Sequence, residues 1–218
     1  MSGVVAASGL VQVFGHHRVL GPIDLRLGAG ERVAVLGDNG AGKTTLLRIL
    51  ATVARPAAGR LELFGLDAST RRDRVRARLG YLGHRTGLYA ALTARENLEF
   101  FATLHDVERG RAVEALAEMD LEAVADRRVE ELSRGQQQRL ALARTILHHP
   151  ELLVVDEPDT GLDAAGRELL GRLMEGRTVV LATHDRRLAR ELCGRGLLLR
   201  GGRDAGDPWE LHLLESSS

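Results

Sequence analysis

The sequence has few of the features that mark secreted or membrane-spanning proteins. Its single cysteine, Cys193, cannot form an internal disulfide, and we expect a small residue on a helix face there. No stretch approaches the ~18 uninterrupted apolar residues of a membrane span. The mildly apolar start has no Lys or Arg before its apolar part and includes Gln12, which disfavours a signal peptide. The sequence therefore predicts a cytoplasmic protein that meets a membrane only through a partner.

An excess of charge of one sign is also lacking. Lys plus Arg and Asp plus Glu each number 30 in 218 residues, so the overall charge does not indicate a nucleic-acid partner. The basic run at residues 71–78 is interrupted by Asp73 and has no interleaved aromatic residues, so we interpret it as a solvated helix face. With 44% hydrophobic and 28% charged residues, the composition is that of an ordinary globular domain.

What the sequence does contain is a glycine-rich loop at residues 37–45, which reads GDNGAGKTT. Its spacing, G-x-x-x-x-G-K-[ST], is that of a phosphate-binding P-loop. Glycines allow backbone angles and close approach that a Cβ would forbid, so successive N–H groups can point at phosphate oxygens. Lys43 can reach the β- and γ-phosphates, and the Thr44 hydroxyl can ligate Mg²⁺. We predict nucleotide binding by the whole loop: Gly37, Asp38, Asn39, Gly40, Ala41, Gly42, Lys43, Thr44 and Thr45.

The segments around this loop distinguish it from a chance glycine-rich turn. Residues 32–36 form a short apolar run of the kind that a buried parallel strand shows, and residues 45–50 are good helix formers. A helix beginning at about Gly42 would add its positive N-terminal end to the same site. Strand, loop and helix thus occur in the order that a P-loop requires.

Acidic and imidazole side chains follow two later strands. Residues 152–157 end in two acids: Asp156 can hold the Mg²⁺ shell, and Glu157 is a candidate to polarise the attacking water. His184 follows a β-branched strand at 178–183, and ligands bind at the carboxyl ends of parallel strands. It could donate a hydrogen bond to the γ-phosphate or orient the water. The alternatives are two solvated acids and a structural histidine.

A capped helix start at residue 133 is a second candidate phosphate site. Ser133 is expected to be the N-cap, with Gln136 three residues on and Gly135 between them. Such a helix end would expose N–H groups and a hydroxyl to an anion. Read alone, the segment predicts an ordinary capped helix.

The order of the elements predicts an α/β fold with a P-loop NTPase core. We expect strands at 10–14 and 23–27 in an N-terminal antiparallel β part, another at 59–65, and a largely parallel sheet. Residues 84–143 have a helical pattern, with helices from Thr93, at 108–119 and at 121–129. We interpret this stretch as a helical subdomain inserted between core segments of about 1–83 and 144–205, within a single domain, 1–218.

Together the motifs resemble the nucleotide-binding subunit of an ATP-binding-cassette (ABC) transporter. The match runs from about residue 10 to 202. Residues 37–44 match Walker A, 132–136 the family signature, 152–156 Walker B and 158–163 the D-loop. The resemblance implies the ABC ATPase fold, ATP and Mg²⁺ as cofactors, Glu157 as the catalytic glutamate and His184 as the switch histidine. Phe14 falls where the family places an aromatic ring that stacks on adenine. The signature is the most diagnostic element, because other P-loop classes lack it.

The resemblance also implies an assembly. Two cassettes, either two copies of this chain or this chain and a homologue, would face head to tail. Ser133, Gly135 and Gln136 of one would then complete the site that contains Lys43 of the other. Membrane permease subunits would dock near residues 84–98, at the cytoplasmic face of the inner membrane.

Two residues depart from the family pattern. Arg134 stands where a small residue is common in the signature, and a positive charge near a phosphate is not harmful. His84 stands where the family usually has glutamine; with residues 87–89 and 92–98 it resembles the haem-exporter ATPase of cytochrome c maturation. Because Mg²⁺ prefers oxygen ligands, we expect the His84 ring to accept a hydrogen bond from a metal-bound or attacking water. The alternative is that His84 packs or contacts the permease.

The leading functional hypothesis is therefore an ATPase subunit of an export complex for haem, linked to cytochrome c biogenesis. One alternative is the ATPase of another exporter, for drugs or lipids. A soluble ABC protein acting on DNA or ribosomes would usually carry a second cassette or long insertions. A P-loop kinase would leave the signature unexplained.

Overall fold

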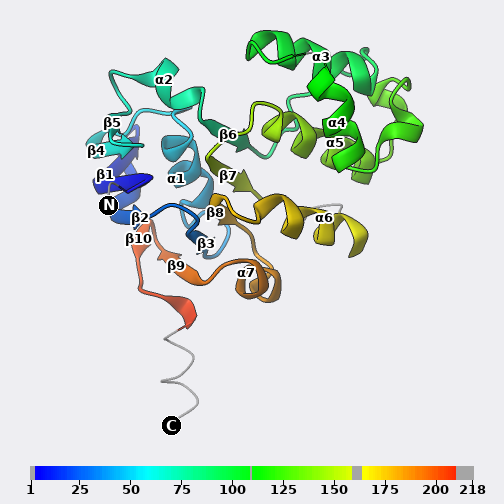
Figure 1. Cartoon of the computed structure of the whole chain (residues 1–218). Coiled ribbons are helices and arrows are strands. Elements are labelled where there is room, and N and C mark those ends of the chain that lie inside the picture. The colour runs from blue at the N-terminus through cyan, green and yellow to red at the C-terminus, as the bar shows by residue number, and fades with distance from the viewer. Residues whose placement is uncertain (1–2, 109, 159–163, 210–218) are drawn as a thin grey trace.

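The computed structural model describes residues 3–108, 110–158 and 164–209, which form two sheets with helices around them (Figure 1). The N-terminal sheet has the strand order β2-β1-β4-β5 and is antiparallel, as predicted. Its strands are β1 (Val5–Phe14), β2 (His17–Leu27), β4 (Ala58–Leu63) and β5 (Leu66–Asp67). β1 begins five residues before the predicted start. Its Ala6 and Ala7 have low strand propensity, but they pair with both β2 and β4.

The second sheet has the order β10-β9-β3-β8-β7-β6. Its strands are β3 (Arg32–Leu36), β6 (Leu79–Leu82), β7 (Leu152–Asp156), β8 (Thr178–Ala182), β9 (Arg195–Arg200) and β10 (Arg203–Asp204). All pairs are parallel except β9 with β10, so the predicted largely parallel sheet is confirmed. β7 and β8 are buried along their whole length, which explains their unbroken apolar sequences.

Two layers of core pack against the second sheet. On one face, α1 (Lys43–Leu50) lies between the two sheets, where Leu46, Leu47, Ile49 and Leu50 are fully buried. On the other face lie α6 (Ala164–Met174) and α7 (Arg186–Leu192), together with the helices at residues 94–146. The P-loop therefore leads from a central strand into a helix that is buried on both sides.

The stretch from residue 84 to 143 is helical in this structure. It contains α3 (Ala94–Leu104), α4 (Gly110–Glu118) and the first part of α5 (Arg134–Ile146). The prediction of a helix at 121–129 is wrong: this segment contains two short 3₁₀ helices instead, η1 (Glu122–Val124) and η2 (Val129–Glu131). A short helix, α2 (Arg72–Arg76), precedes β6, in the basic run that was interpreted as a helix face. In the described part of the chain, no helix is both long enough and apolar enough to cross a bilayer.

Candidate functional site

The P-loop follows β3 and depends on glycine at specific positions. Gly37, Gly40 and Gly42 have φ values of 147°, 81° and 99°, in the region that favours glycine. A Cβ on Gly37 would lie 2.4 Å from the carbonyl oxygen of Leu199, and one on Gly42 would lie 2.9 Å from that of Val19. Backbone therefore crowds both ends of the loop, and only glycine fits at these two positions.

Lys43 is the first residue of α1 and is only 7% exposed. Its ammonium group donates hydrogen bonds to the carbonyl oxygens of Gly37 (2.7 Å) and Asp38 (3.2 Å). The loop is closed further by a hydrogen bond from the Ala41 N–H to the Asp38 carbonyl, at 3.0 Å. These bonds hold the one cation of the loop over the concave side of its backbone.

One cleft of about 590 Å³ collects most of the predicted residues. It is lined by Val19, Asn39, Gly40, Gly42, Lys43, Thr44, Thr45, His84, Glu157 and His184. Gly37 and Asp38 line a second hollow that shares Asn39 and His184 with the first. Val19, an apolar residue within β2, is the member that the sequence did not indicate. It reaches the cleft because Gly42 of the P-loop packs against the backbone of β2 at Val19.

Asp156 ends β7 and is 2% exposed, yet neither carboxylate oxygen has a hydrogen-bond partner among the described residues. Burial raises the pKa of Asp156, and the neighbouring Thr44 hydroxyl and Lys43 ammonium only partly oppose that shift. A buried carboxylate without a partner is costly unless it binds a cation. Its oxygens, with the Thr44 hydroxyl beside them, are the donor set that Mg²⁺ prefers.

Glu157 and His184 meet at the ends of two neighbouring strands. β7 and β8 pair in parallel, with Asp156 opposite Ala182, so the next residues of both strands leave the sheet side by side. Nδ1 of His184 lies 2.5 Å from Oε2 of Glu157. The Glu157 side chain is 20% exposed, whereas that of His184 is 70% exposed. Glu157 has φ of 52°, and its N–H bonds to the Ala182 carbonyl, which fixes this turn of the backbone.

His84 reaches the cleft from β6, a strand that the sequence analysis missed. β6 pairs in parallel with β7, so its end lies at the same edge of the sheet as Asp156. His84 is exposed and comes two residues after β6 ends. Gly80 interrupts the short apolar sequence of β6, and arginines precede it, so the sequence does not indicate a strand there. What identifies β6 as a strand is its parallel pairing with β7, and this pairing cannot be inferred from the local sequence.

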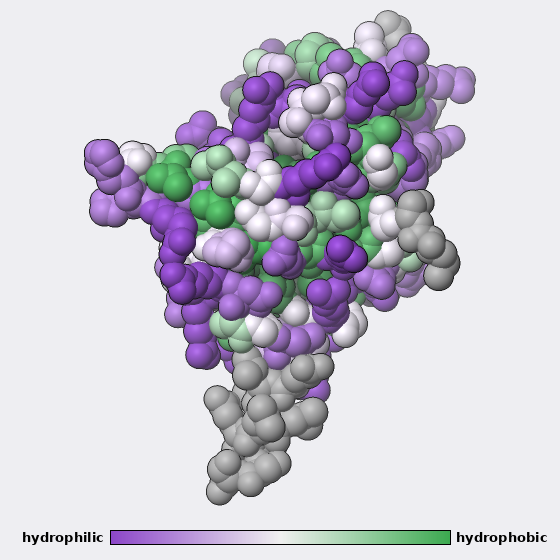
Figure 2. All heavy atoms as spheres, turned by 90° about the vertical axis from the view of Figure 1, so that its left-hand side faces the viewer, coloured by the Kyte–Doolittle hydropathy of each residue, from purple (hydrophilic) through white to green (hydrophobic). Residues whose placement is uncertain are grey.

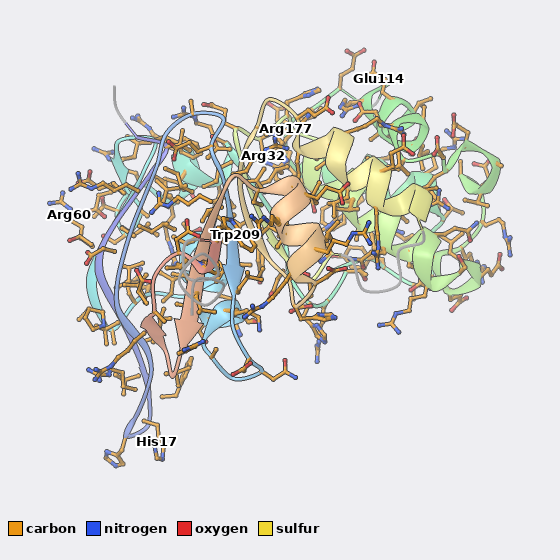
Figure 3. All side chains as sticks on the ribbon, turned by 90° about the horizontal axis from the view of Figure 1, so that it is seen from below. His17, Arg32, Arg60, Glu114, Arg177 and Trp209 are labelled. Carbon is orange, nitrogen blue, oxygen red and sulfur yellow. The ribbon has the colours of Figure 1, made fainter. Side chains whose placement is uncertain are left out.

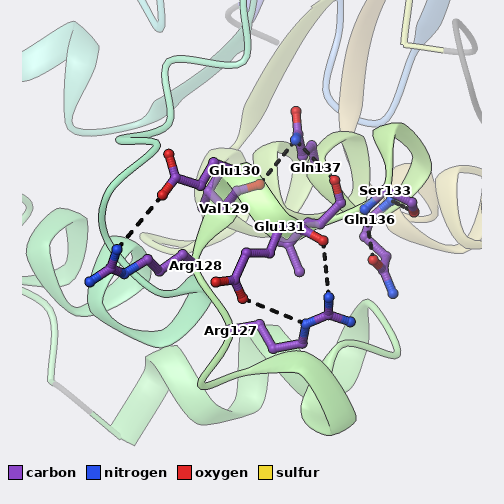
Figure 4. Close-up of polar contacts among 9 residues, drawn as sticks. Arg127, Arg128, Val129, Glu130, Glu131, Ser133, Gln136 and Gln137 are labelled. Carbon is purple, nitrogen blue, oxygen red and sulfur yellow. Dashed lines mark hydrogen bonds and ion pairs between the residues drawn. The ribbon is translucent and has the colours of Figure 1, made fainter.

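Ser133, Gly135 and Gln136 lie at the start of α5 and are not among the residues that line the cleft. The predicted cap is confirmed as a full capping box: Ser133 Oγ accepts from Gln136 N–H, and Gln136 Oε1 accepts from Ser133 N–H (Figure 4). Gln137 donates to the carbonyls of Val129 and Leu132 and so fixes the chain before the helix (Figure 4). The P-loop and the start of α5, the two candidate phosphate sites, therefore do not share this cleft within one copy of the chain.

Phe14 is also outside the lining of the cleft. It ends β1, is 56% exposed and pairs with His17, at the tip of a hairpin that extends away from the body (Figure 3). Of the predicted D-loop, Pro158 is described and its carbonyl accepts a hydrogen bond from Gln138 at 3.1 Å. Residues 159–163 lie outside the described part of the chain.

Comparisons with known proteins find similar sequences and similar folds. The sequence model of the family described as ABC transporter matches residues 20–160. The daunorubicin resistance ATP-binding protein DrrA3 of Streptomyces coeruleorubidus is 38% identical over 208 residues, 91% of this chain and 66% of its own length. This chain therefore spans just under two thirds of that relative. The lipoprotein-releasing system ATP-binding protein LolD 1 of Caulobacter vibrioides is 38% identical over 223 residues, covering 93% and 95% of the two chains.

A solved structure is similar over almost the whole fold. It is the dimeric, post-hydrolysis state of the ATP-binding cassette MJ0796, bound to ADP and Pi. The match has a TM-score of 0.84 and 28% identity, and it covers 93% of this chain and 97% of that one. The two relatives described above are named for drug resistance and lipoprotein release, and neither is named for haem.

Proposed function

The chain belongs to the ABC transporter family, and from this premise we propose that it binds and hydrolyses ATP to drive an export complex. The observation that carries the proposal is the cleft, where the P-loop residues Lys43 and Thr44 line the same space as Glu157 and His184. Phosphate-binding groups and a candidate general base thus face one substrate. That combination is what nucleotide hydrolysis requires.

Each group has a separate task in this mechanism. The P-loop N–H groups and the Lys43 ammonium hold the phosphates and offset their negative charge. Asp156 and Thr44 would hold Mg²⁺, which when bound neutralises charge on the phosphate oxygens. Glu157 accepts a proton from the attacking water, and His184, hydrogen-bonded to Glu157, orients that carboxylate. His84 accepts a hydrogen bond from a water in the cleft.

We propose that the active unit contains two cassettes. Ser133, Gly135 and Gln136 are remote from the cleft of their own chain, so a second chain facing head to tail would present them to its nucleotide. The dimeric state of the similar cassette supports this arrangement. Phe14 would stack on the adenine ring of the bound nucleotide, since it lies on the same β1–β2 hairpin as Val19, which lines the cleft.

Permease subunits are the proposed membrane partners, and they would hold the cassette at the cytoplasmic face of the membrane. Tyr89 and Phe100 are 49% and 44% exposed, and Leu104, on the same helix as Phe100, is 67% exposed. The rings of Tyr89 and Phe100 contact each other edge to face, with centroids 5.1 Å apart. An exposed aromatic and aliphatic group of this kind, next to the His84 segment, is suited to a protein partner.

For the cargo, we propose a drug or an amphiphilic lipid-like molecule, following the named functions of the two relatives. Haem export is the second candidate, because His84 replaces the usual glutamine. The genes beside this one discriminate between the two: a drug-type permease would support the first, and a haem-handling membrane protein would support the second.

The test of the proposed activity compares two variants. Glu157→Gln keeps the shape of the side chain but cannot accept a proton, so it should bind ATP and lose hydrolysis by about a hundredfold or more. Lys43→Ala should weaken ATP binding itself. Titration with a fluorescent ATP analogue and steady-state phosphate release measure the two effects separately. Hydrolysis near the native rate by Glu157→Gln would remove that residue from the mechanism.

A further inference from the structure

The charge of this chain is unevenly distributed, although its total is zero. Residues 48–78 contain eight arginines and three acidic residues, Glu62, Asp67 and Asp73. Several of these arginines have internal partners: Arg60 pairs with Glu62 and Asp67, and Arg78 pairs with Glu151. The side chains of Arg55, Arg71 and Arg74 are exposed and make no ion pair or hydrogen bond with any described residue. We refer to these three as the arginine surface.

The helix under the arginine surface is firmly anchored. On the inner side of α2, Arg72 donates to the carbonyl of Thr52 at 2.8 Å, and Arg76 donates to the same carbonyl at 3.0 Å and to the Thr52 hydroxyl at 3.0 Å. Val75 is fully buried beside them. Arg71 and Arg74, three residues apart on the other side of this turn, are thereby held toward solvent. The arginines of α2 thus divide into an anchoring pair and an outward pair.

Arg55 joins this group from the segment that follows α1. It lines a cavity of about 210 Å³ together with Arg72, Ser69 and the apolar side chains of Ile49 and Leu61. The exposed Val53, 46% exposed, lies two residues away in sequence. The arginine surface therefore lies beside a small cavity that is partly apolar. The face of the molecule on this side is largely hydrophilic, with hydrophobic side chains in smaller groups between (Figure 2).

The position of α2 indicates what these groups face. α2 and α3 lie at the same end of the molecule, the top of Figure 1, and α7 and β10 lie toward the opposite end. The α3 end bears the exposed aromatic and aliphatic side chains proposed above to contact the permease. A permease seated there would hold the arginine surface close to the bilayer, at the depth of the lipid headgroups.

We propose that the arginine surface binds anionic lipid headgroups, so that the cassette contacts the membrane directly as well as through its permease. The placement of the arginine surface near the bilayer rests on the proposed function, but its positive charge does not. Guanidinium groups bind phosphate oxygens in pairs of hydrogen bonds and stay protonated at any physiological pH. Asp73 offsets one charge and leaves a positive surplus. Bare phosphate on nucleic acid has the same charge, but no aromatic side chains flank these arginines to stack on bases.

The experiment measures binding to vesicles by flotation, with no permease present. Native protein should float with vesicles of phosphatidylcholine mixed with phosphatidylglycerol, and not with phosphatidylcholine alone. Each arginine near an anionic surface strengthens binding about fivefold, so Arg55→Gln/Arg71→Gln/Arg74→Gln should weaken it by up to about a hundredfold. Moderate salt should weaken native binding in the same direction. A control, Arg26→Gln/Arg187→Gln/Arg203→Gln, has the same net charge and removes exposed arginines from β2, α7 and β10.

Each outcome bears on the proposal. Equal weakening by the two triple variants would mean that total charge alone matters and would overturn it, as would the absence of binding to anionic vesicles. Binding of a DNA oligonucleotide that depends on the arginine surface, without vesicle binding, would assign the surface to nucleic acid instead. ATP-analogue binding, measured on the same samples, should be native in both triple variants. If native protein does not bind the ATP analogue either, the proposed ATPase function fails. The vesicle result would still test lipid binding by the arginine surface.

Discussion

Acidification should destabilise this protein through a stacked pair of histidines. The rings of His105, at the end of α3, and His148, just after α5, are stacked with their centroids 4.1 Å apart and their planes within 2°. Nε2 of His148 lies 3.1 Å from the Leu79 carbonyl oxygen and donates to it, while Nδ1 is buried without a partner among the described residues. Adding a proton at Nδ1 would place a charge in this stack, beside Arg144.

The size of the effect follows from the pKa of His148. Burial, with the nearby charges of His105, His149 and Arg144, lowers this pKa from 6.5 to about 4 in the folded state, despite the bond to Leu79. The unfolded chain therefore binds more protons than the folded one between these values, so stability falls as pH falls from 6.5 toward 4. A shift of this size corresponds to at most about 3 kcal/mol in the free energy of unfolding. Burial lowers the pKa of His105 as well, which acts in the same direction.

Urea unfolding at a series of pH values measures this loss. His148→Gln can still donate to Leu79 but does not titrate, so its free energy of unfolding should fall less than that of the native protein over the same range. His17→Gln, which replaces an exposed ring at the hairpin tip, is the matched control and should follow the native curve. Parallel curves for native protein and His148→Gln would refute the reasoning, because every other titrating group is shared.

Two further predictions concern the loop before α3 and the assembly. Asn97 is fully buried and makes four hydrogen bonds, to the N–H and carbonyl of Tyr89 and to the carbonyls of Leu92 and Thr93. Asn97→Ala should lower the free energy of unfolding by about 3 kcal/mol, measured in urea, and a loss below about 1 kcal/mol would contradict this account. Glu157→Gln with Mg-ATP should change from monomer to dimer in light scattering, since both phosphate-facing ends are needed to close a site. A persistent monomer at saturating Mg-ATP would count against the two-cassette arrangement.

The parts that the sequence predicted well depend on neighbours within the chain. The P-loop is specified by glycines whose φ values are local properties. The capping boxes that start α3 (Thr93 with Glu96) and α5 (Ser133 with Gln136) each join residues three apart. β3, β7 and β8 are apolar except for one terminal residue each, because both faces of the sheet are covered there, so their positions are evident from the sequence.

The parts that it missed depend on distant contacts. β6 is a four-residue strand whose pairing with β7 joins residues more than seventy positions apart, and without it the route of His84 to the cleft is not visible. Val19 lines the cleft only because β2 packs against the P-loop. Residues 121–129 are helix formers by propensity, but bonds from Ala94 N–H to Arg127 and from Arg95 N–H to Ala125 tie this segment to α3 in a tighter form.

The P-loop also contains the one side chain of this protein that reacts as a lysine amine. Lys43 is the only lysine in the 218 residues; every other permanent cation is an arginine, whose guanidinium does not react with acylating reagents under mild conditions. The Lys43 ammonium is buried and already donates to two carbonyls, so acylation must wait for the loop to open. Any modification of a lysine side chain in this sequence would thus fall within the P-loop. Mass spectrometry after brief acylation would report loop opening at one residue, without an engineered label.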